Sequence, residues 1–272
     1  MRKKILVFTG AGVSAESGIQ TFRDIKNGFW YNYKVEDVAT PDGWRKDKSK
    51  VLDFYNQRRA QLKDVNPNLA HQIIADLEKD FDVTILTQNV DDLHERAGST
   101  NITHLHGELK KARSTVDPSI IVDCFGDINI GDKCFKGSQL RPHIVWFSEM
   151  LDPGDIEYSR QVANKADVCI VVGTSMQVSP ANLIPFTTKE DCLIYYVDPG
   201  DVDFKVSDYR KTFFYHIKEN ATTGMRKVYD DLDIQRLLND GKIETWFTRK
   251  KNSLELKHRP ESLKSLDDNM LL

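Results

Sequence analysis

Two histidines are separated by a single residue in the segment His104-Leu105-His106-Gly107. The ordinary pKa of histidine lies near neutrality, so its imidazole is the usual side-chain base at this pH. We expect at most one of the two rings to face a reaction site. We choose His106, because the glycine after it lets a ligand approach closely.

The segment Gln88-Asn89-Val90-Asp91 carries two amides and a carboxylate directly after an apolar run. Amide side chains both donate and accept hydrogen bonds, and a carboxylate accepts them. Together these groups suit ribose hydroxyls, an amide, or a positioned water molecule. The alternative is an ordinary polar loop in which Asp91 caps the next helix.

A glycine-rich turn, Gly10-Ala11-Gly12-Val13-Ser14-Ala15, follows the apolar run at residues 5–8 and fits the dinucleotide pattern G-x-G-x-x-A. Such turns bring backbone N–H groups up to a phosphate. Taken alone, with Asp37 of the pair Glu36-Asp37 as a ribose ligand, the turn indicates a hydride-transferring oxidoreductase.

The segment Thr21-Phe22-Arg23-Asp24 favours different chemistry. An aromatic ring soon after a phosphate turn could cap a nicotinamide, and an arginine could hold an anionic group. The alternative is that Phe22 packs in the core and Arg23 pairs with Asp24.

Four apolar runs, at residues 5–8, 82–86, 167–173 and 192–197, are continuous rather than alternating. Strands of this kind are covered on both faces, as in a parallel sheet of an α/β protein. Polar residues follow the carboxyl end of each run, at the edge where open α/β sheets bind ligands. We therefore predict one site at this edge.

Helices are predicted between the strands. Asn66-Pro67 is typical of a helix start, with asparagine as N-cap and proline in the first position. The apolar face that follows at helical spacing comprises Leu69, Ile73, Ile74 and Leu77. Another helix is predicted near residues 50–62. Residues about 24–66 and 110–140 interrupt the pattern as inserts of a small lobe beside the sheet.

The composition excludes several classes of protein. The chain has 272 residues, with 38 Lys plus Arg against 41 Asp plus Glu, and a net charge of −3. This balance gives no general attraction to nucleic acid or to an anionic membrane. No apolar run approaches the roughly 18 residues of a membrane helix. Four cysteines without a CxxC pair argue against a disulfide framework, so we expect a cytoplasmic protein.

Taken together, the motifs resemble those of the sirtuins, a family of NAD-dependent protein-lysine deacylases. The matching segments, in family order, are residues 10–19, 21–23, 87–94, 105–107, 140–147 and 173–175. The resemblance implies an α/β fold with a Rossmann-like parallel sheet, helices on both faces and a small inserted lobe. It places a catalytic domain at residues 1–238, with small-lobe inserts at about 24–66 and 110–140, and leaves a polar C-terminal extension at 239–272.

The resemblance also implies a reaction without hydride transfer. The bond between nicotinamide and ribose breaks, the acyl-lysine oxygen attacks the ribose C1′ carbon, and the products are nicotinamide and O-acyl-ADP-ribose. His106 would be the general base, with Asn89 as a second catalytic residue. The residues that would bind NAD are Gly10, Ala11, Gly12, Ser14, Ala15, Thr21, Phe22, Arg23, Gln88, Asn89, Asp91, Gly173, Thr174, Ser175, Asp198 and Ala221.

Substrate-binding residues are expected in two segments. Val145, Trp146 and Phe147 would pair with the backbone of an acylated protein or peptide, although a buried apolar strand explains them as well. Tyr55 and Arg58 stand at the place where one sirtuin class binds acidic acyl groups, and they share a helix face. The alternative is an amphipathic helix with Phe54 inside and its arginines in solvent.

The sequence departs from the family at its zinc site. Sirtuins usually carry two CxxC pairs on the small lobe, whereas this chain has Ser114 and Asp117 at the first pair and Cys134 without a partner near the second. We expect NAD as cofactor and no zinc, and the remaining alternative is an improvised site that includes Cys124.

Three other functions are compatible with parts of the sequence. An NAD glycohydrolase or ADP-ribosyltransferase would need the NAD chemistry without a peptide groove. A module that senses NAD without turnover would not need His106 or Asn89. An oxidoreductase rests on the glycine turn alone.

Overall fold

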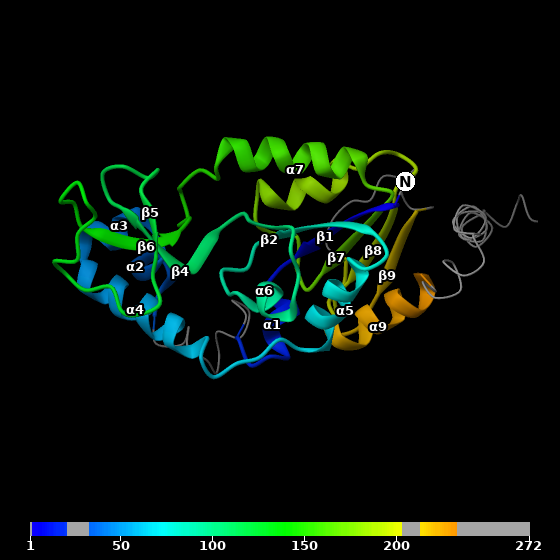
Figure 1. The fold of residues 1–272 in the computed structure, drawn as a ribbon, viewed down its shortest axis with the longest axis horizontal. Coiled ribbons are helices and arrows are strands. Elements are labelled where there is room, and N and C mark those ends of the chain that lie inside the picture. Colours follow the sequence, from blue (N-terminus) through cyan, green and yellow to red (C-terminus); the bar gives the residue numbers. More distant parts are fainter. Residues whose placement is uncertain (1, 21–32, 203–212, 233–272) are drawn as a thin grey trace, which may run out of the picture.

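A six-stranded sheet forms the centre of the molecule, in the order β3-β2-β1-β7-β8-β9 with every neighbouring pair parallel (Figure 1). The computed structural model describes residues 2–20, 33–202 and 213–232. The strands are β1 (Lys4–Thr9), β2 (Asp82–Thr87), β3 (Ile102–His104), β7 (Val168–Val172), β8 (Leu193–Val197) and β9 (Phe214–Ile217). Strands β1, β2, β7 and β8 correspond to the four predicted apolar runs, so the predicted parallel α/β sheet is confirmed.

Helices cover both faces of this sheet. Helices α5 (Leu69–Leu77) and α9 (Ala221–Leu232) pack on one face, and α7 (Pro153–Lys165) and the 3-10 helix η2 (Ala181–Thr187) lie over the other (Figure 1). Strand β1 shows why its apolar run is continuous. Val7 packs in the core under α5 and α9, whereas Leu6 and Phe8 pack in the core under α7.

Helix α5 begins later than the sequence predicted. Its N-cap is Asn68, whose Oδ1 accepts from Ala70 N at 2.9 Å, while Asn68 N donates to His71 Nδ1 at 3.3 Å. This reciprocal capping box satisfies two backbone donors at once. Asn66 instead accepts a hydrogen bond from Arg96, so the predicted cap at Asn66 is wrong.

The small lobe combines helices and strands. Helices α2 (Val35–Val38), α3 (Pro41–Lys46) and α4 (Lys48–Gln61) pack against an antiparallel sheet in the order β5-β4-β6. The sheet consists of β4 (Gly107–Ser114), β5 (Ile121–Asp123) and β6 (Leu140–Ile144). Side chains from both parts, including Tyr55 of α4 and Leu109 of β4, share one core. The helix predicted near residues 50–62 is α4.

Two short helices follow strand ends. Helix α1 (Gly12–Ala15) comes after β1 and α6 (Leu93–Ala97) after β2. Within the described residues no helix is both long and apolar enough to cross a bilayer. The predicted extension at 239–272 lies outside the described residues.

Candidate active site

The carboxyl ends of β1, β2, β7 and β8 meet at one edge of the sheet. Backbone hydrogen bonds continue the ladder one residue past the strands, from Gly10 N to Val172 O (3.0 Å), Gln88 N to Thr9 O (2.9 Å) and Gly173 N to Val197 O (2.8 Å). The predicted residues that follow these strands are therefore brought together, as expected for the ligand edge of an α/β sheet.

The glycines of the first turn allow it to pack directly on the turn after β7. A Cβ on Gly10 would lie 2.6 Å from Thr174 Cβ, and one on Gly12 would lie 2.7 Å from Gly173 Cα. Gly12 N donates to Gly173 O at 2.8 Å. The amides of Gly10 and Gly12 are thus used within the protein, and close approach of two backbones is the first reason for these glycines.

Ser14 is fully buried and connects three polar side chains. Its hydroxyl donates to Asp91 Oδ2 at 3.0 Å and accepts from Asn89 Nδ2 at 3.1 Å. His71 Nε2 lies 3.4 Å from the same oxygen. On the other side of the ring, His71 Nδ1 lies 3.3 Å from Asn68 N and 3.1 Å from Asn68 Oδ1, so this imidazole connects the cap of α5 to Ser14.

Asp91 is anchored from two sides. Its Oδ1 accepts from Leu93 N, the first residue of α6, at 3.1 Å, in addition to the bond from Ser14. Burial raises the pKa of this carboxyl, while the hydrogen bonds from Leu93 and Ser14 oppose that shift. Asp91 thus binds the start of α6, whose N-cap is Asp92, and at the same time lies beside Asn89 and Ser14.

The two histidines of the first motif differ in their partners. His104 is engaged at both ring nitrogens, with Asn89 O 2.8 Å from Nδ1 and Glu95 Oε1 2.7 Å from Nε2. His106 has Gln88 O 3.1 Å from Nδ1. Since a carbonyl oxygen only accepts, Nδ1 of His106 carries the proton and Nε2 holds a lone pair. Burial lowers the pKa of His106, against the opposing hydrogen bond to Gln88, so the ring is neutral at pH 7.

Gly107 serves the backbone next to His106. It has φ +84°, and a Cβ there would lie 2.0 Å from His143 O on strand β6. The sequence attributed this glycine to close approach of a ligand, but the close neighbour is the adjacent strand.

Helix α4 carries the predicted acyl-binding pair. Tyr55 is buried, and burial raises the pKa of its phenol, which stays protonated. Arg58 is half-buried, and desolvation lowers the pKa of its guanidinium while Tyr55 and Asp91 raise it. The guanidinium carbon lies 5.9 Å from the centre of the Phe54 ring. Arg59 is only 3% exposed, so the alternative that leaves both arginines in solvent is wrong.

The segment Val145-Trp146-Phe147 leaves β6 beside His106. Val145 N donates to His106 O and Phe147 N to Ala39 O, each at 2.9 Å. Trp146 is buried, whereas Phe147 is 46% exposed. The amides of Val145 and Phe147 are already paired within the chain, so a peptide strand added here would have to use other backbone groups.

Glu149 holds this segment in place and was missed from the sequence. Its carboxylate accepts from Arg113 Nη2 (2.9 Å), from Arg141 Nη1 and Nη2 (2.8 Å each) and from Trp146 N (2.9 Å). The Arg141 guanidinium also lies 3.7 Å over the Trp146 ring. His71 was missed as well, because the helical pattern around it indicated only a core face.

The remaining predicted residues lie at the same edge or outside the described chain. Thr174 accepts from Gln88 Nε2 at 3.2 Å, and Asp198 Oδ1 accepts from Gly200 N at 2.8 Å. Ser175 is half-buried after Thr174, and Ala221 starts α9, where the adjacent Thr222 binds Glu16, the neighbour of Ala15. The predicted residues outside the described ranges are Thr21, Phe22 and Arg23.

The positions at which the sequence resemblance led us to look for zinc ligands hold other interactions. Ser114 Oγ lies 2.7 Å from Ser138 Oγ, and Cys134 Sγ lies 3.2 Å from the same hydroxyl. Lys136 Nζ donates to Asp117 at 2.7 Å. In the described part of the chain, no group of three or more His, Cys, Asp or Glu side chains could hold a metal ion.

The chain is similar to known proteins over most of its length. The family model described as "Sir2 family" matches residues 10–180. A protein of Helicobacter pylori named "NAD-dependent protein deacylase" is 50% identical over 197 residues, covering 72% of this chain and 85% of that protein. A protein of the same name from Aggregatibacter actinomycetemcomitans is 47% identical over 200 residues, covering 74% of this chain and 95% of that protein.

Solved structures show the same fold. A Sir2 homologue in complex with NAD superposes with a TM-score of 0.75 at 37% identity, covering 87% of this chain and 91% of that one. A mutant Sir2 homologue in complex with ADP-ribose has a TM-score of 0.77 at 37% identity, covering 88% of this chain and 94% of that one.

Proposed function

Since the chain belongs to the Sir2 family and is an NAD-dependent protein-lysine deacylase, we propose that it favours acidic acyl groups, succinyl and malonyl, and also accepts acetyl. The observation that carries this proposal is the pairing of a protonated phenol, Tyr55, with a half-buried guanidinium, Arg58, on α4 beside the sheet edge. The proposed products are nicotinamide and O-acyl-ADP-ribose, and the proposed partner is an acylated protein or peptide.

The residues at the sheet edge suit NAD by their chemistry. Asn89 and Gln88 offer amides, Asp91 a carboxylate and Thr174 a hydroxyl, which match ribose hydroxyls and a carboxamide. The closely packed turns at Gly10 and Gly173 leave no side chain between the two backbones. NAD, when bound, supplies a ribose C1′ carbon that accepts the acyl oxygen as nicotinamide leaves.

The proposed roles of the polar residues follow from their partners. Ser14 fixes both Asn89 and Asp91, so that neither side chain must be ordered when the ribose binds. His106 holds its lone pair at Nε2 and accepts a proton from a ribose hydroxyl there. Thr21, Phe22 and Arg23, with Ala11 and Ala15, are proposed to complete the cofactor site, and Asp198 and Ala221 its adenosine side.

Arg58 gives the acidic acyl group a counter-charge. A hydrogen bond to a charged group contributes about 1.5–3 kcal/mol, and about 1.4 kcal/mol corresponds to a tenfold preference. The low solvent exposure of α4 on this side strengthens the attraction between the guanidinium and a carboxylate.

The experiment compares kcat/KM for succinyl- and acetyl-lysine peptides in wild type and Arg58→Met. Methionine replaces the aliphatic stem of arginine and removes the charged guanidinium, so desuccinylation should fall by about tenfold or more relative to deacetylation. Arg45→Met, at an exposed arginine of α3, is the matched control and should change neither rate. Equal loss of both activities in Arg58→Met contradicts the proposed preference.

Nicotinamide release, measured with and without an acyl-peptide, distinguishes the proposed deacylation from NAD glycohydrolysis. A glycohydrolase releases nicotinamide without an acyl-peptide, whereas the proposed enzyme requires one.

The four cysteines are free, which is consistent with the cytoplasmic location that we propose.

A further inference from the structure

We propose that Asn56 is a positioning residue that fixes the rotation of α4 about its axis, and so sets where Tyr55 and Arg58 stand for the acyl group. This inference rests on the proposed acidic-acyl function. It adds a residue that makes no contact with the acyl group and acts from another side of the helix.

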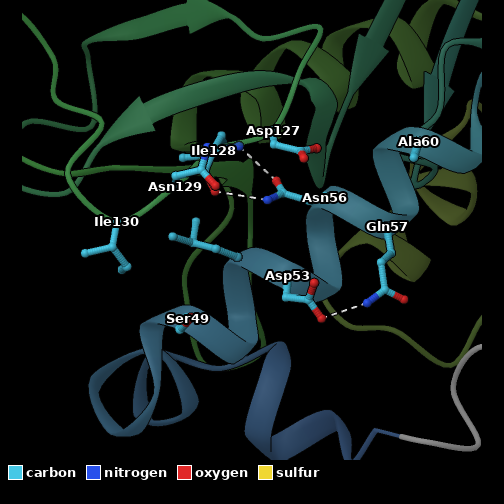
Figure 2. Close-up of a pocket in the computed structure, with 10 residues that line it drawn as sticks. Ser49, Asp53, Asn56, Gln57, Ala60, Asp127, Ile128, Asn129 and Ile130 are labelled. Carbon is cyan, nitrogen blue, oxygen red and sulfur yellow. Dashed lines mark hydrogen bonds between the residues drawn. The ribbon is translucent and has the colours of Figure 1, made fainter.

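Asn56 binds the small-lobe loop through both atoms of its amide. Asn56 Oδ1 accepts from Ile128 N at 2.9 Å, and Asn56 Nδ2 donates to Ile128 O at 3.0 Å. Figure 2 shows these two bonds reaching from α4 across to the loop at residues 127–130. One side chain thus satisfies both backbone groups of one residue, which a hydroxyl, a carboxylate or an apolar side chain cannot do in the same way.

Arg59 ties the same amide to strand β4. Its Nη1 donates to Asn56 Oδ1 at 2.9 Å, and its Nε donates to Leu109 O at 2.6 Å. Arg59 is 3% exposed, so loss of these bonds would leave a buried charge with fewer partners. Together, Asn56 and Arg59 join α4 to a loop and a strand of the lobe.

On this side of α4, the buried side chains of Leu52 and of Ile128 in the loop belong to the same apolar core. A cavity of about 340 Å³ lies between the helix and the loop, lined by Leu52, Asp53, Asn56, Ala60, Asp127 and Ile128 (Figure 2). The two hydrogen bonds of Asn56 to Ile128 add directional links beside this cavity, which apolar packing alone does not supply.

A small rotation of α4 would move the acyl-binding group substantially. Successive residues of an α-helix are about 100° apart, so Asn56 and Arg58 point about 200° apart and leave the helix on opposite sides. An atom about 6 Å from the helix axis moves by about 1 Å when the helix turns by about 10°. A misplacement of that size can reduce a reaction rate by about a hundredfold.

The experiment measures kcat and KM for succinyl- and acetyl-lysine peptides, and KM for NAD, in wild type, Asn56→Ala and Asn56→Asp. In Asn56→Ala, the KM for the succinyl peptide should rise by about tenfold, more than that for the acetyl peptide, with KM for NAD unchanged. Asn56→Asp keeps the acceptor for Ile128 N and Arg59, so its KM for the succinyl peptide should lie between those of wild type and Asn56→Ala. This second variant provides the test if Asn56→Ala does not fold.

Two further measurements sharpen the comparison. Hydrogen exchange at the Ile128 amide should be faster in Asn56→Ala, because its acceptor is removed. Gln57→Ala is the matched control, since Gln57 lies on the same helix and binds Asp53 rather than the loop; it should leave all constants unchanged.

The outcomes distinguish this inference from the proposed function. If wild type and Asn56→Ala prefer the succinyl peptide over the acetyl peptide to the same extent, the inference is contradicted and the proposed function is not. Equal loss for both acyl groups together with a raised KM for NAD shows a merely structural role and also contradicts it. A wild type without acidic preference contradicts the proposed function, and the inference with it.

Discussion

The lone pair on Nε2 of His106 is the group on which the proposed proton transfer depends. It is available because Gln88 O occupies the other ring nitrogen, which must then carry the proton. A neighbouring histidine, His104, has both nitrogens occupied and serves the fold. At the scale of single residues, hydrogen-bond partners rather than residue type separate a base from a structural side chain.

The pH dependence of kcat/KM should show an acid limb below pH 6.5. The neutral form of His106 is the active form, and activity is lost as the pH falls through its pKa, which burial lowers. His106→Asn should reduce kcat by about 10²–10⁴-fold. The measurement is a pH–rate profile with the acyl-peptide, and an acid limb centred above pH 7 would contradict this assignment.

The backbone conformation of Ser148 leads to a prediction about stability. It follows Phe147 with φ 70°, in the left-handed region that costs a non-glycine residue about 1 kcal/mol. Ser148→Gly should therefore be more stable than Ser148→Ala by about 1 kcal/mol, which corresponds to about 2–4 °C in Tm. Thermal unfolding of both variants measures this, and equal midpoints would show that the backbone is unstrained there.

Candidate site residues could be recognised from the sequence where a polar or titratable residue type follows the end of a strand. Asn89, Asp91 and His106 were singled out as candidates in this way. Glu149 was not, because its importance comes from two arginines, Arg113 and Arg141, that reach it only in the folded lobe.

At the scale of elements, β1, β2, β7 and β8 were predictable because burial on both faces requires continuous apolar runs. Strands β3 and β9 have three and four residues, and half-exposed positions break their pattern. The sheet of the small lobe was also not predicted, since β4 and β6 are held together by pairing between segments distant in sequence.

The lobe makes a prediction about metal removal. At the positions that the sequence resemblance assigns to a cysteine pair, Ser114 binds Ser138 and Asp117 binds Lys136, so we expect side-chain hydrogen bonds to stabilise the lobe there without a metal. A chelator such as EDTA should leave Tm and deacylase activity unchanged. Elemental analysis should find less than one zinc per chain, and stoichiometric zinc that is lost together with stability would contradict the prediction.

At the scale of the whole molecule, the active-site edge coincides with the junction between sheet and lobe. On its second passage through the lobe, the chain enters directly after His106 and leaves at Val145, and these two points are joined by the bond from Val145 N to His106 O. Helix α4 belongs to the lobe, whereas Asn89 and Asp91 follow a strand of the central sheet. The residues proposed for acyl specificity and those proposed for NAD binding therefore lie in different parts of the molecule.

The whole protein should lose stability in mild acid. Burial lowers the pKa of His71 to about 4 and that of His94 well below its ordinary value, so both are neutral in the folded state. Between pH 6.5 and 4 the unfolded chain binds protons that the folded chain does not, so the free energy of unfolding falls as pH falls. His71 alone contributes about 1.4 kcal/mol per pH unit in this range.

Urea unfolding at pH 7 and pH 5 measures this loss. The variant His71→Gln removes one of the histidines whose pKa burial lowers and should show a smaller difference between the two pH values. Equal stability of the wild type at both would mean that the buried histidines titrate in the folded protein.

The central claim is that this deacylase selects acidic acyl groups through Arg58. Its most direct test is the ratio of kcat/KM for succinyl- and acetyl-lysine peptides of one sequence, with NAD, followed by mass spectrometry of the peptide and of the ADP-ribose product. We predict a ratio of about ten or more in the wild type. A ratio at or below one, with acetyl removed as readily as succinyl, would contradict the account.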